Sequence, residues 1–136
     1  MDDGDEVTLV VPARPEFLGL VRVTVAGLAS RLGFTFDQIE DLRLAIDELC
    51  FGLTGTKGKD GTLEVRFVLD EEGLAVHGEG HFAAGGTSGL SELSQIILGA
   101  LVDEHSLTAA AFGPRFSFVK KREGPTTRQN PPGEGQ

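Results

Sequence analysis

The stretch TFDQIEDLRLAIDELCFGL, residues 35–53, decides the fold of this chain. Its apolar residues recur at alternating steps of three and four, at Ile39, Leu42, Ile46, Leu49 and Leu53. That spacing places them in one stripe of an amphipathic α-helix. Asp37 stands where an N-cap residue is expected, and Glu40 follows three positions later, as in a capping box. The sequence therefore predicts a long helix that is capped at Asp37 and buries one face.

A second row of residues borders this apolar stripe. At about 100° per residue, Asp41, Ala45, Glu48 and Gly52 fall on a common flank of the helix. A carboxylate at the edge of a buried face can lose part of its hydration and still reach a ligand, which makes Glu48 a candidate functional residue. A solvated helix glutamate fits the same pattern, so the spacing alone leaves both interpretations open.

The composition limits the class of protein. The chain has 136 residues, of which 40% are hydrophobic, and this suits one soluble domain with a sizeable core. The formal charge of −9 argues against a nucleic-acid binder and suits a basic protein partner. No apolar run reaches the length of a membrane span, and the single cysteine, Cys50, excludes an internal disulfide. These features predict a cytoplasmic protein that does not contact a membrane.

The residues before the long helix predict a strand and another helix. Residues 6–11 (EVTLVV) form a strand that Pro12 ends. The following helix runs from Pro15 to about Leu32, and Gly33 ends it. Its apolar face comprises Phe17, Val21, Val25, Leu28 and Leu32. The run VRVTV favours a strand by propensity, but the longer helical period decides for a helix.

The residues after the long helix predict a strand pair, a third helix and a final hairpin. Residues 54–61 form a turn-rich loop, after which 62–69 and 74–82 pair as antiparallel strands, the second breaking up at its glycines. A helix at 90–102 turns Leu93, Ile96, Ile97, Ala100 and Leu101 inward. Residues 106–112 and 115–120 form a hairpin that turns at Gly113-Pro114.

This element order predicts a two-layer α/β sandwich. Three helices cover one face of a mostly antiparallel sheet. We expect residues 1–5 to be frayed and residues 6–121 to form one domain. Residues 122–136 are rich in Pro, Gly and polar side chains, so we expect a disordered tail there.

Two features of residues 15–53 carry a family resemblance. One is the helix RVTVAGLASRLGF, residues 22–34, followed closely by a second helix with an acidic cap. The other is the ending AIDELCFGL, residues 45–53. Together they resemble the N-terminal half of bacterial anti-sigma-factor serine kinases, which are GHKL ATPases like gyrase and the histidine kinases. The resemblance extends over about residues 6–121 and implies a histidine-kinase-like ATPase domain with the Bergerat ATP-binding fold.

The resemblance implies an ATP and magnesium site, and this chain departs from the family pattern there. In the first family box, a Glu acts as general base and an Asn four residues later holds magnesium on the triphosphate. Glu48 matches the base, but Gly52 stands at the Asn position. The second box is an Asp-x-Gly turn that holds the adenine amino group. Its counterpart here is Gly78-Glu79-Gly80, where Gly78 replaces the Asp while Glu79 and Gly80 remain.

The third family box is a glycine-rich loop whose backbone N–H groups receive phosphates. Its best match is Ser91-Glu92-Leu93-Ser94, with Gly85, Gly86 and Gly89 a little upstream. The glycines are absent from the match itself, and Glu92 would repel phosphate. Three altered boxes predict that magnesium-dependent ATP binding is impaired or lost.

Arg22 falls on the arginine that the resembled kinases use against their partners. An arginine on a packing helix can make bidentate contacts with a partner carboxylate, although a solvated or helix-paired arginine fits the pattern as well. The resemblance therefore implies a regulatory protein that binds a sigma factor or a STAS-type antagonist and is a homodimer. The alternative is an active serine kinase that phosphorylates an anti-anti-sigma partner, with Glu48 as base.

A third interpretation is a small metal-binding domain. His77, Glu79 and His81 project from one face of a regular strand, which would bring three ligand types together. Three ligands within five residues of one strand rarely close a tetrahedral site, so the sequence predicts no metal centre.

Overall fold

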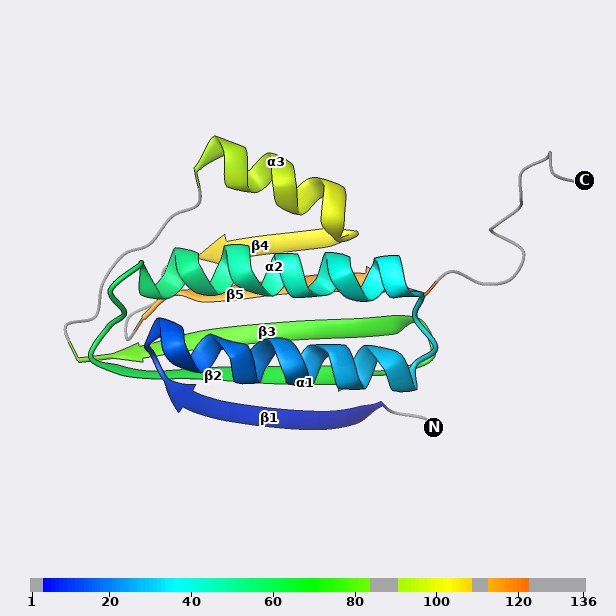
Figure 1. Cartoon of the computed structure of the whole chain (residues 1–136), viewed down its shortest axis with the longest axis horizontal. Helices are drawn as coiled ribbons and strands as arrows, with labels where there is room; N and C mark the ends of the chain where they lie inside the picture. Colours follow the sequence, from blue (N-terminus) through cyan, green and yellow to red (C-terminus); the bar gives the residue numbers. More distant parts are fainter. Residues whose placement is uncertain (1–3, 84–90, 109–112, 123–136) are drawn as a thin grey trace, which may run out of the picture.

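Five strands form a single antiparallel sheet in the computed structural model, which describes residues 4–83, 91–108 and 113–122 (Figure 1). The spatial order is β1-β2-β3-β5-β4, so the last two strands pair with each other and β5 joins the sheet beside β3. The strands span Asp5–Pro12 (β1), Gly61–Leu69 (β2), Gly73–Phe82 (β3), Glu104–Thr108 (β4) and Arg115–Lys121 (β5).

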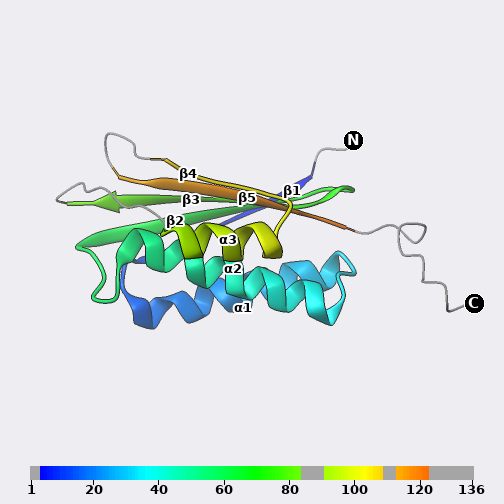
Figure 2. The same cartoon turned by 90° about the horizontal axis from the view of Figure 1, so that it is seen from above.

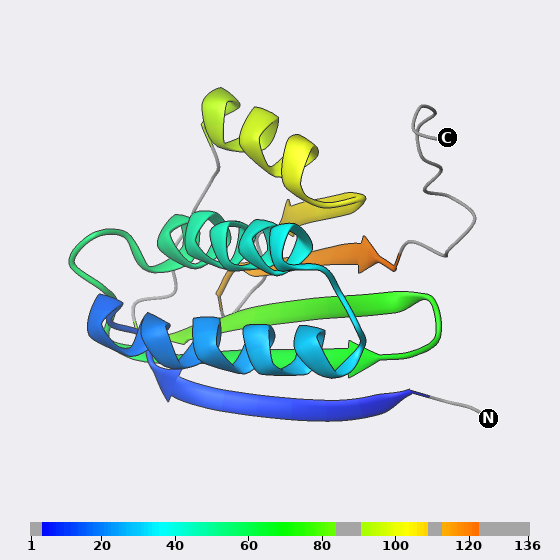
Figure 3. The same cartoon turned by 45° about the vertical axis from the view of Figure 1, so that its right-hand side comes forward.

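The helices lie on one face of this sheet and leave the other face open (Figure 2). A short 3-10 turn, Pro15–Phe17, leads into α1 (Leu18–Arg31), and α2 (Phe36–Thr54) and α3 (Glu92–Leu101) follow. Figure 3 shows α2 between α1 and α3. The two-layer α/β sandwich predicted from the sequence is therefore confirmed, and its layers fit the GHKL type of fold. The described helices are too short or too polar to cross a membrane.

The core lies between the inner face of the sheet and the apolar stripes of α1 and α2. Alternate residues of the strands point inward, because successive side chains in a strand project to opposite faces. The fully buried residues include Leu63, Val65, Phe67 and Val76 from the sheet, Val21 and Val25 from α1, and Leu42, Ile46, Leu49 and Leu53 from α2. Burying each such side chain contributes about 1.5–3 kcal/mol. The stripe predicted for residues 35–53 thus holds the two layers together.

The predicted cap of the long helix is wrong by two residues. Thr35, not Asp37, is the N-cap: its hydroxyl accepts from the Gln38 N–H at 3.1 Å, and the Gln38 side chain accepts from the Thr35 N–H at 2.8 Å. Thr35 keeps an extended backbone, so the helix begins at Phe36 and Asp37 lies in its first turn. There its charge complements the helix dipole. Glu40 instead pairs with Arg43 at 2.9 Å.

The strand β3 does not break up at its glycines, as the sequence had predicted. It continues to Phe82, with Gly78 opposite Val65 and Gly80 opposite Leu63. Both glycines lie on the inner face, where aromatic rings take the space that their side chains would need. Glycine weakens a strand in isolation, but here its lack of a side chain lets an aromatic ring pack directly against the backbone.

The inward face predicted for α3 is wrong at three of its five residues, Leu93, Ile96 and Ala100, which are exposed, whereas Ile97 is half-buried and Leu101 packs against the core. Leu98 is the buried residue of this helix, whereas Leu93 and Ile96 are 66% and 70% exposed. Among the described helices, α3 has α2 as its neighbour and lies at the edge of the helical layer (Figure 3). A single row of side chains therefore makes the contact of α3 with the rest of the protein, and apolar residues on its other sides face outward.

Three further predictions agree with the structure. The run VRVTV is helical, and Gly33 ends α1 with a φ of 81°, a conformation that favours glycine. The strands β4 and β5 pair antiparallel as predicted, and residues 109–112 of the predicted hairpin lie outside the described part. The frayed N-terminus and the disordered tail stay predictions.

Candidate functional site

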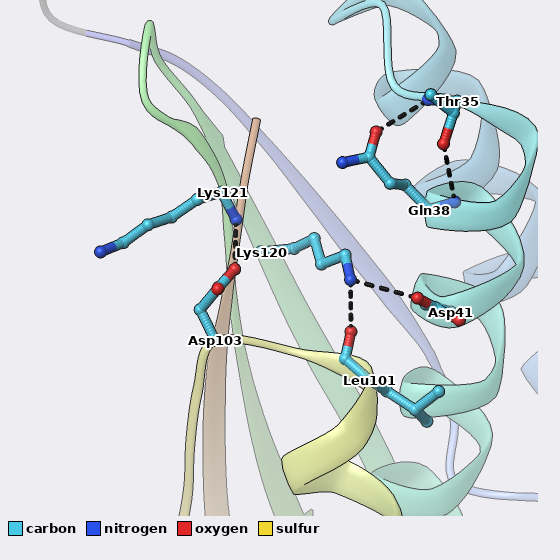
Figure 4. Close-up of polar contacts among 7 residues, drawn as sticks. All are labelled: Thr35, Gln38, Asp41, Leu101, Asp103, Lys120 and Lys121. Carbon is cyan, nitrogen blue, oxygen red and sulfur yellow. Dashed lines mark hydrogen bonds and ion pairs between the residues drawn. The ribbon is translucent and has the colours of Figure 1, made fainter. Parts of the chain in front are cut away.

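The second row of α2 faces the side on which α3 and β5 lie. Asp41, at the start of this row, pairs with Lys120 of β5 at 3.2 Å (Figure 4). The Lys120 ammonium also donates to the Leu101 carbonyl, at the end of α3, at 2.6 Å. The side chain of Lys120 is only 14% exposed, so this cation joins α2, α3 and the sheet in a nearly buried position. Glu48 and Gly52 continue the same row further along the helix.

Glu48 is half-buried, at the boundary between the core and the surface. Within the described part of the chain it has no hydrogen bond or ion pair. Gly52, one turn later, carries no side chain that could bind a cation. The structure thus brings the predicted base and the altered magnesium position together on one flank of α2.

The structure separates Glu79 from Glu48. Gly78 and Gly80 lie on the inner, helix-covered face of β3, whereas Glu79 projects from the outer face. A side chain at position 78 would run into the ring of Phe116, and one at position 80 into the ring of Phe82. Phe116 therefore fills the space that a side chain at position 78 would need, and Glu79 points away from it.

The match to the third box begins α3. The Ser91 hydroxyl accepts from the Ser94 N–H at 3.0 Å and so caps the helix, with Glu92 in the first turn. The Ser94 N–H, which could otherwise donate to a phosphate, thus already donates to the Ser91 hydroxyl. Gly85, Gly86 and Gly89 lie outside the described residues.

Arg22 lies in a surface groove on α1. Its Nε donates to Asp47 of α2 at 2.7 Å, and the two side chains are about one-third exposed, at 36% and 33%. The groove has a volume of about 530 Å³, and its lining combines apolar and charged side chains: Glu16, Gly19, Leu20, Arg22, Val23, Ala26 and Arg43. Leu20 and Val23 are 53% and 71% exposed. Exposed apolar side chains beside two arginines suit a protein segment that carries both apolar and acidic residues.

Cys50 of α2 lies in the core and is fully buried. Burial raises the pKa of its thiol to about 12, with the Asp47 charge adding to the rise and Arg22 opposing it. The thiol is therefore protonated and acts as a small packing residue rather than as a nucleophile.

The open face of the sheet brings together charged residues of β2, β3 and β5. The predicted trio is only partly assembled: Glu79 and His81 approach each other, and Glu64 of β2 takes the third position in place of His77. The pKa of His77 is lowered by burial and by the nearby Arg66, which Glu6 partly offsets.

Lys120 and Phe116 were not predicted from the sequence. The signal for Lys120 was present, because residues 116, 118 and 120 alternate to one face of a strand, and a lysine on that face requires an acidic partner. The contact between Phe116 and Gly78 depends on β5 pairing with β3, which no local pattern specifies.

Comparisons with known proteins agree with the resemblance. The chain is 38% identical over 77 residues to the serine-protein kinase RsbW of Bacillus pumilus, a match covering 53% of this chain and 48% of the relative. It is 38% identical to RsbW of Bacillus subtilis over 55% of this chain and 49% of the relative. For RsbW of Bacillus velezensis the identity is 41%, over 53% and 47%. No protein-family model matches the chain.

The resemblance to anti-sigma-factor serine kinases is thus confirmed over about half of the chain. The chain also spans about half the length of the curated relatives it matches.

Proposed function

We propose that this chain is an anti-sigma-factor-like regulatory protein of GHKL serine-kinase descent. It binds a sigma factor or a STAS-type antagonist and acts by sequestering that partner. Its binding of ATP and magnesium is impaired or lost. The observation that carries the proposal is a contrast. The groove around Arg22 offers a binding surface, while Phe116 fills the space beside Gly78, the residue that we match to the family's adenine-binding Asp.

One structural feature at each of the three family boxes supports impaired nucleotide binding. The Phe116 ring is almost fully buried and packs where an Asp at position 78 would project. Gly52 supplies no ligand for magnesium, which prefers oxygen donors from side chains such as Asp, Glu and Asn. Ser91 already satisfies a backbone N–H at the start of α3. Each change removes a different part of the energy that would hold a nucleotide.

The partner side is supported by the geometry of Arg22. Asp47 fixes its Nε and so orders a long side chain that would otherwise lose conformational freedom on binding. A guanidinium has further N–H groups that can meet a partner carboxylate. The exposed Leu20 and Val23 beside it provide apolar area for the same partner.

An active serine kinase is the second candidate function. The observation in its favour is Glu48, a half-buried carboxylate without a partner among the described residues. It would take the proton of a partner serine as ATP donates its phosphate. This function requires a magnesium ligand in place of the missing Asn. Whether the chain is an enzyme is therefore decided by phosphate transfer.

The test uses purified sigma factors and STAS-domain proteins from the source bacterium. We expect at least one of them to form a complex with the chain without added nucleotide. Arg22→Ala should weaken this complex at least about tenfold, a change of about 1.4 kcal/mol. Arg66→Ala is the matched control, because Arg66 lies on the open face of the sheet. Binding to none of these proteins would contradict the proposal, and labelled ATP that phosphorylates the STAS protein would establish the kinase instead.

The proposal places the protein in the cytoplasm, where sigma factors are, and treats it as a homodimer. Light scattering coupled to size-exclusion chromatography measures the second point, since a monomer of 14.4 kDa and a dimer are readily separated. A monomer at all concentrations would remove the dimer from the proposal and leave partner binding intact.

A further inference from the structure

Three potential metal ligands converge on the open face of the sheet. Glu64 lies on β2, and Glu79 and His81 lie on the adjacent strand β3. Glu64 and Glu79 are directly opposite each other in the strand pairing. His81 is two residues after Glu79, so both side chains project from the same face. This face lies away from the helices, from Glu48 and from the Arg22 groove.

The distances among the three side chains fit one bound ion. His81 Nε2 lies 3.2 Å from Glu64 Oε1 and 3.4 Å from Glu79 Oε1, and all three ligand atoms lie within 4.8 Å of one another. Zinc binds imidazole nitrogen and carboxylate oxygen at about 2.0–2.2 Å, which places neighbouring ligands about 3–3.5 Å apart. Only small side-chain movements would therefore be needed to close the three ligands on an ion.

The charges at this place also favour a cation. Two carboxylates directly opposite each other on adjacent strands repel and destabilise the pairing. Arg115 Nε binds Glu79 Oε2 at 2.7 Å, which leaves Glu79 Oε1 facing His81. The His81 ring nitrogen makes its hydrogen bond with Glu64, and within the described part of the chain Glu64 has no other charged partner. A divalent ion would bind the Glu64 and Glu79 oxygens that face His81 and use the lone pair of the imidazole nitrogen.

We propose that Glu64, Glu79 and His81 bind a divalent first-row transition-metal ion of the zinc class. A mixed set of one imidazole and two carboxylates favours zinc, cobalt or nickel over magnesium and calcium, which prefer oxygen ligands alone. The three side chains are 34–44% exposed, so the outer coordination positions are open to water. Arg115 is a positioning residue, since it holds the Glu79 carboxylate from its far oxygen.

The test is a calorimetric titration of the full chain with Zn²⁺ after removal of metal by a chelator, supported by the visible spectrum of the Co²⁺ form. We expect saturable binding of one ion per chain that excess Mg²⁺ does not displace. His81→Ala and Glu64→Gln should each weaken binding at least about tenfold, and Arg115→Gln by about tenfold through the carboxylate it holds.

His77→Ala is the matched control, because His77 lies on the same strand and face but outside the trio, and it should bind Zn²⁺ as the wild type does. Far-ultraviolet circular dichroism of each metal-free variant establishes that it is folded, and Glu64→Gln keeps the shape of the side chain if His81→Ala does not fold. Absence of saturable binding, or binding that both the His81 and the Glu64 variants retain, would overturn the proposal. So would an equal loss in His77→Ala.

Discussion

Because Phe116 packs against Gly78, we expect even the smallest added side chain, the methyl group of alanine, to destabilise the protein. An ideal Cβ at Gly78 meets three atoms of the Phe116 ring, all closer than real Cβ contacts allow. Phe116 is 3% exposed and packs beside Phe118, with the ring centroids 6.4 Å apart, so it has little room to move. Gly78→Ala therefore forces the core to shift.

The expected size of the effect combines two opposing contributions. Inserting a methyl group into a well-packed core costs about 1–3 kcal/mol. Replacing glycine lowers the entropy of the unfolded chain and returns about 0.4–1 kcal/mol. We therefore expect Gly78→Ala to lower the free energy of unfolding by roughly 0.5–2 kcal/mol. Phe116→Leu replaces the ring with a smaller side chain. Gly78→Ala should therefore cost less free energy of unfolding in the Phe116→Leu background than in the wild type.

Urea unfolding followed by circular dichroism measures this change through the midpoint at constant slope. Gly27→Ala is the matched control: Gly27 is an exposed residue inside α1, and a Cβ there meets nothing within 4 Å. It should stabilise the protein by about 0.5–1 kcal/mol. If Gly78→Ala were as stabilising as Gly27→Ala, Phe116 would not cover Gly78, and this support for the proposed impairment of adenine binding would fail.

Three further predictions concern the polar contacts of α2. A double-mutant cycle on Arg22 and Asp47 should give a coupling of about 0.2–1 kcal/mol in urea unfolding, because both side chains are part-exposed; zero coupling would mean that Asp47 does not hold Arg22. Lys120→Met should lower the free energy of unfolding by about 1–3 kcal/mol, because Asp41 and the Leu101 carbonyl lose the ammonium donor. A change below about 0.5 kcal/mol would count against this contact. Because burial raises the pKa of Cys50 from 9.0 to about 12, the folded thiol keeps its proton above pH 9 while the unfolded one loses it. The wild type should therefore lose stability above pH 9 relative to Cys50→Ala, by up to about 1.4 kcal/mol per pH unit, and parallel pH profiles would show that Cys50 is not so buried.

The fold was predictable where local patterns and long-range packing agree. The three- and four-residue steps from Ile39 to Leu53 identify α2, and those residues do meet the sheet. The cap was wrong because Thr35 and Asp37 both suit an N-cap, and only the backbone conformation of Thr35 decides between them. The face of α3 was wrong because its sequence is apolar on several sides, so the pattern does not say which row meets α2.

The candidate site was predictable only along single elements. The common flank of Glu48 and Gly52 follows from helix geometry, and the outward direction of Glu79 follows from strand alternation. The partners of these residues come from other strands: Phe116 reaches Gly78 from β5, and Glu64 reaches His81 from β2. Such contacts depend on strand order and register, which the sequence pattern of one strand does not specify.

The most direct test of the account is a calorimetric titration of the purified chain with ATP and ADP, with and without Mg²⁺. We expect no measurable heat and no thermal shift, whereas a bound nucleotide at a hundred times its dissociation constant would stabilise the fold by about 2.7 kcal/mol. Micromolar, magnesium-dependent binding would contradict it. That result would mean that another carboxylate replaces the missing Asn and that Phe116 leaves room for adenine, and the chain would then be a candidate for an active kinase with Glu48 as its base.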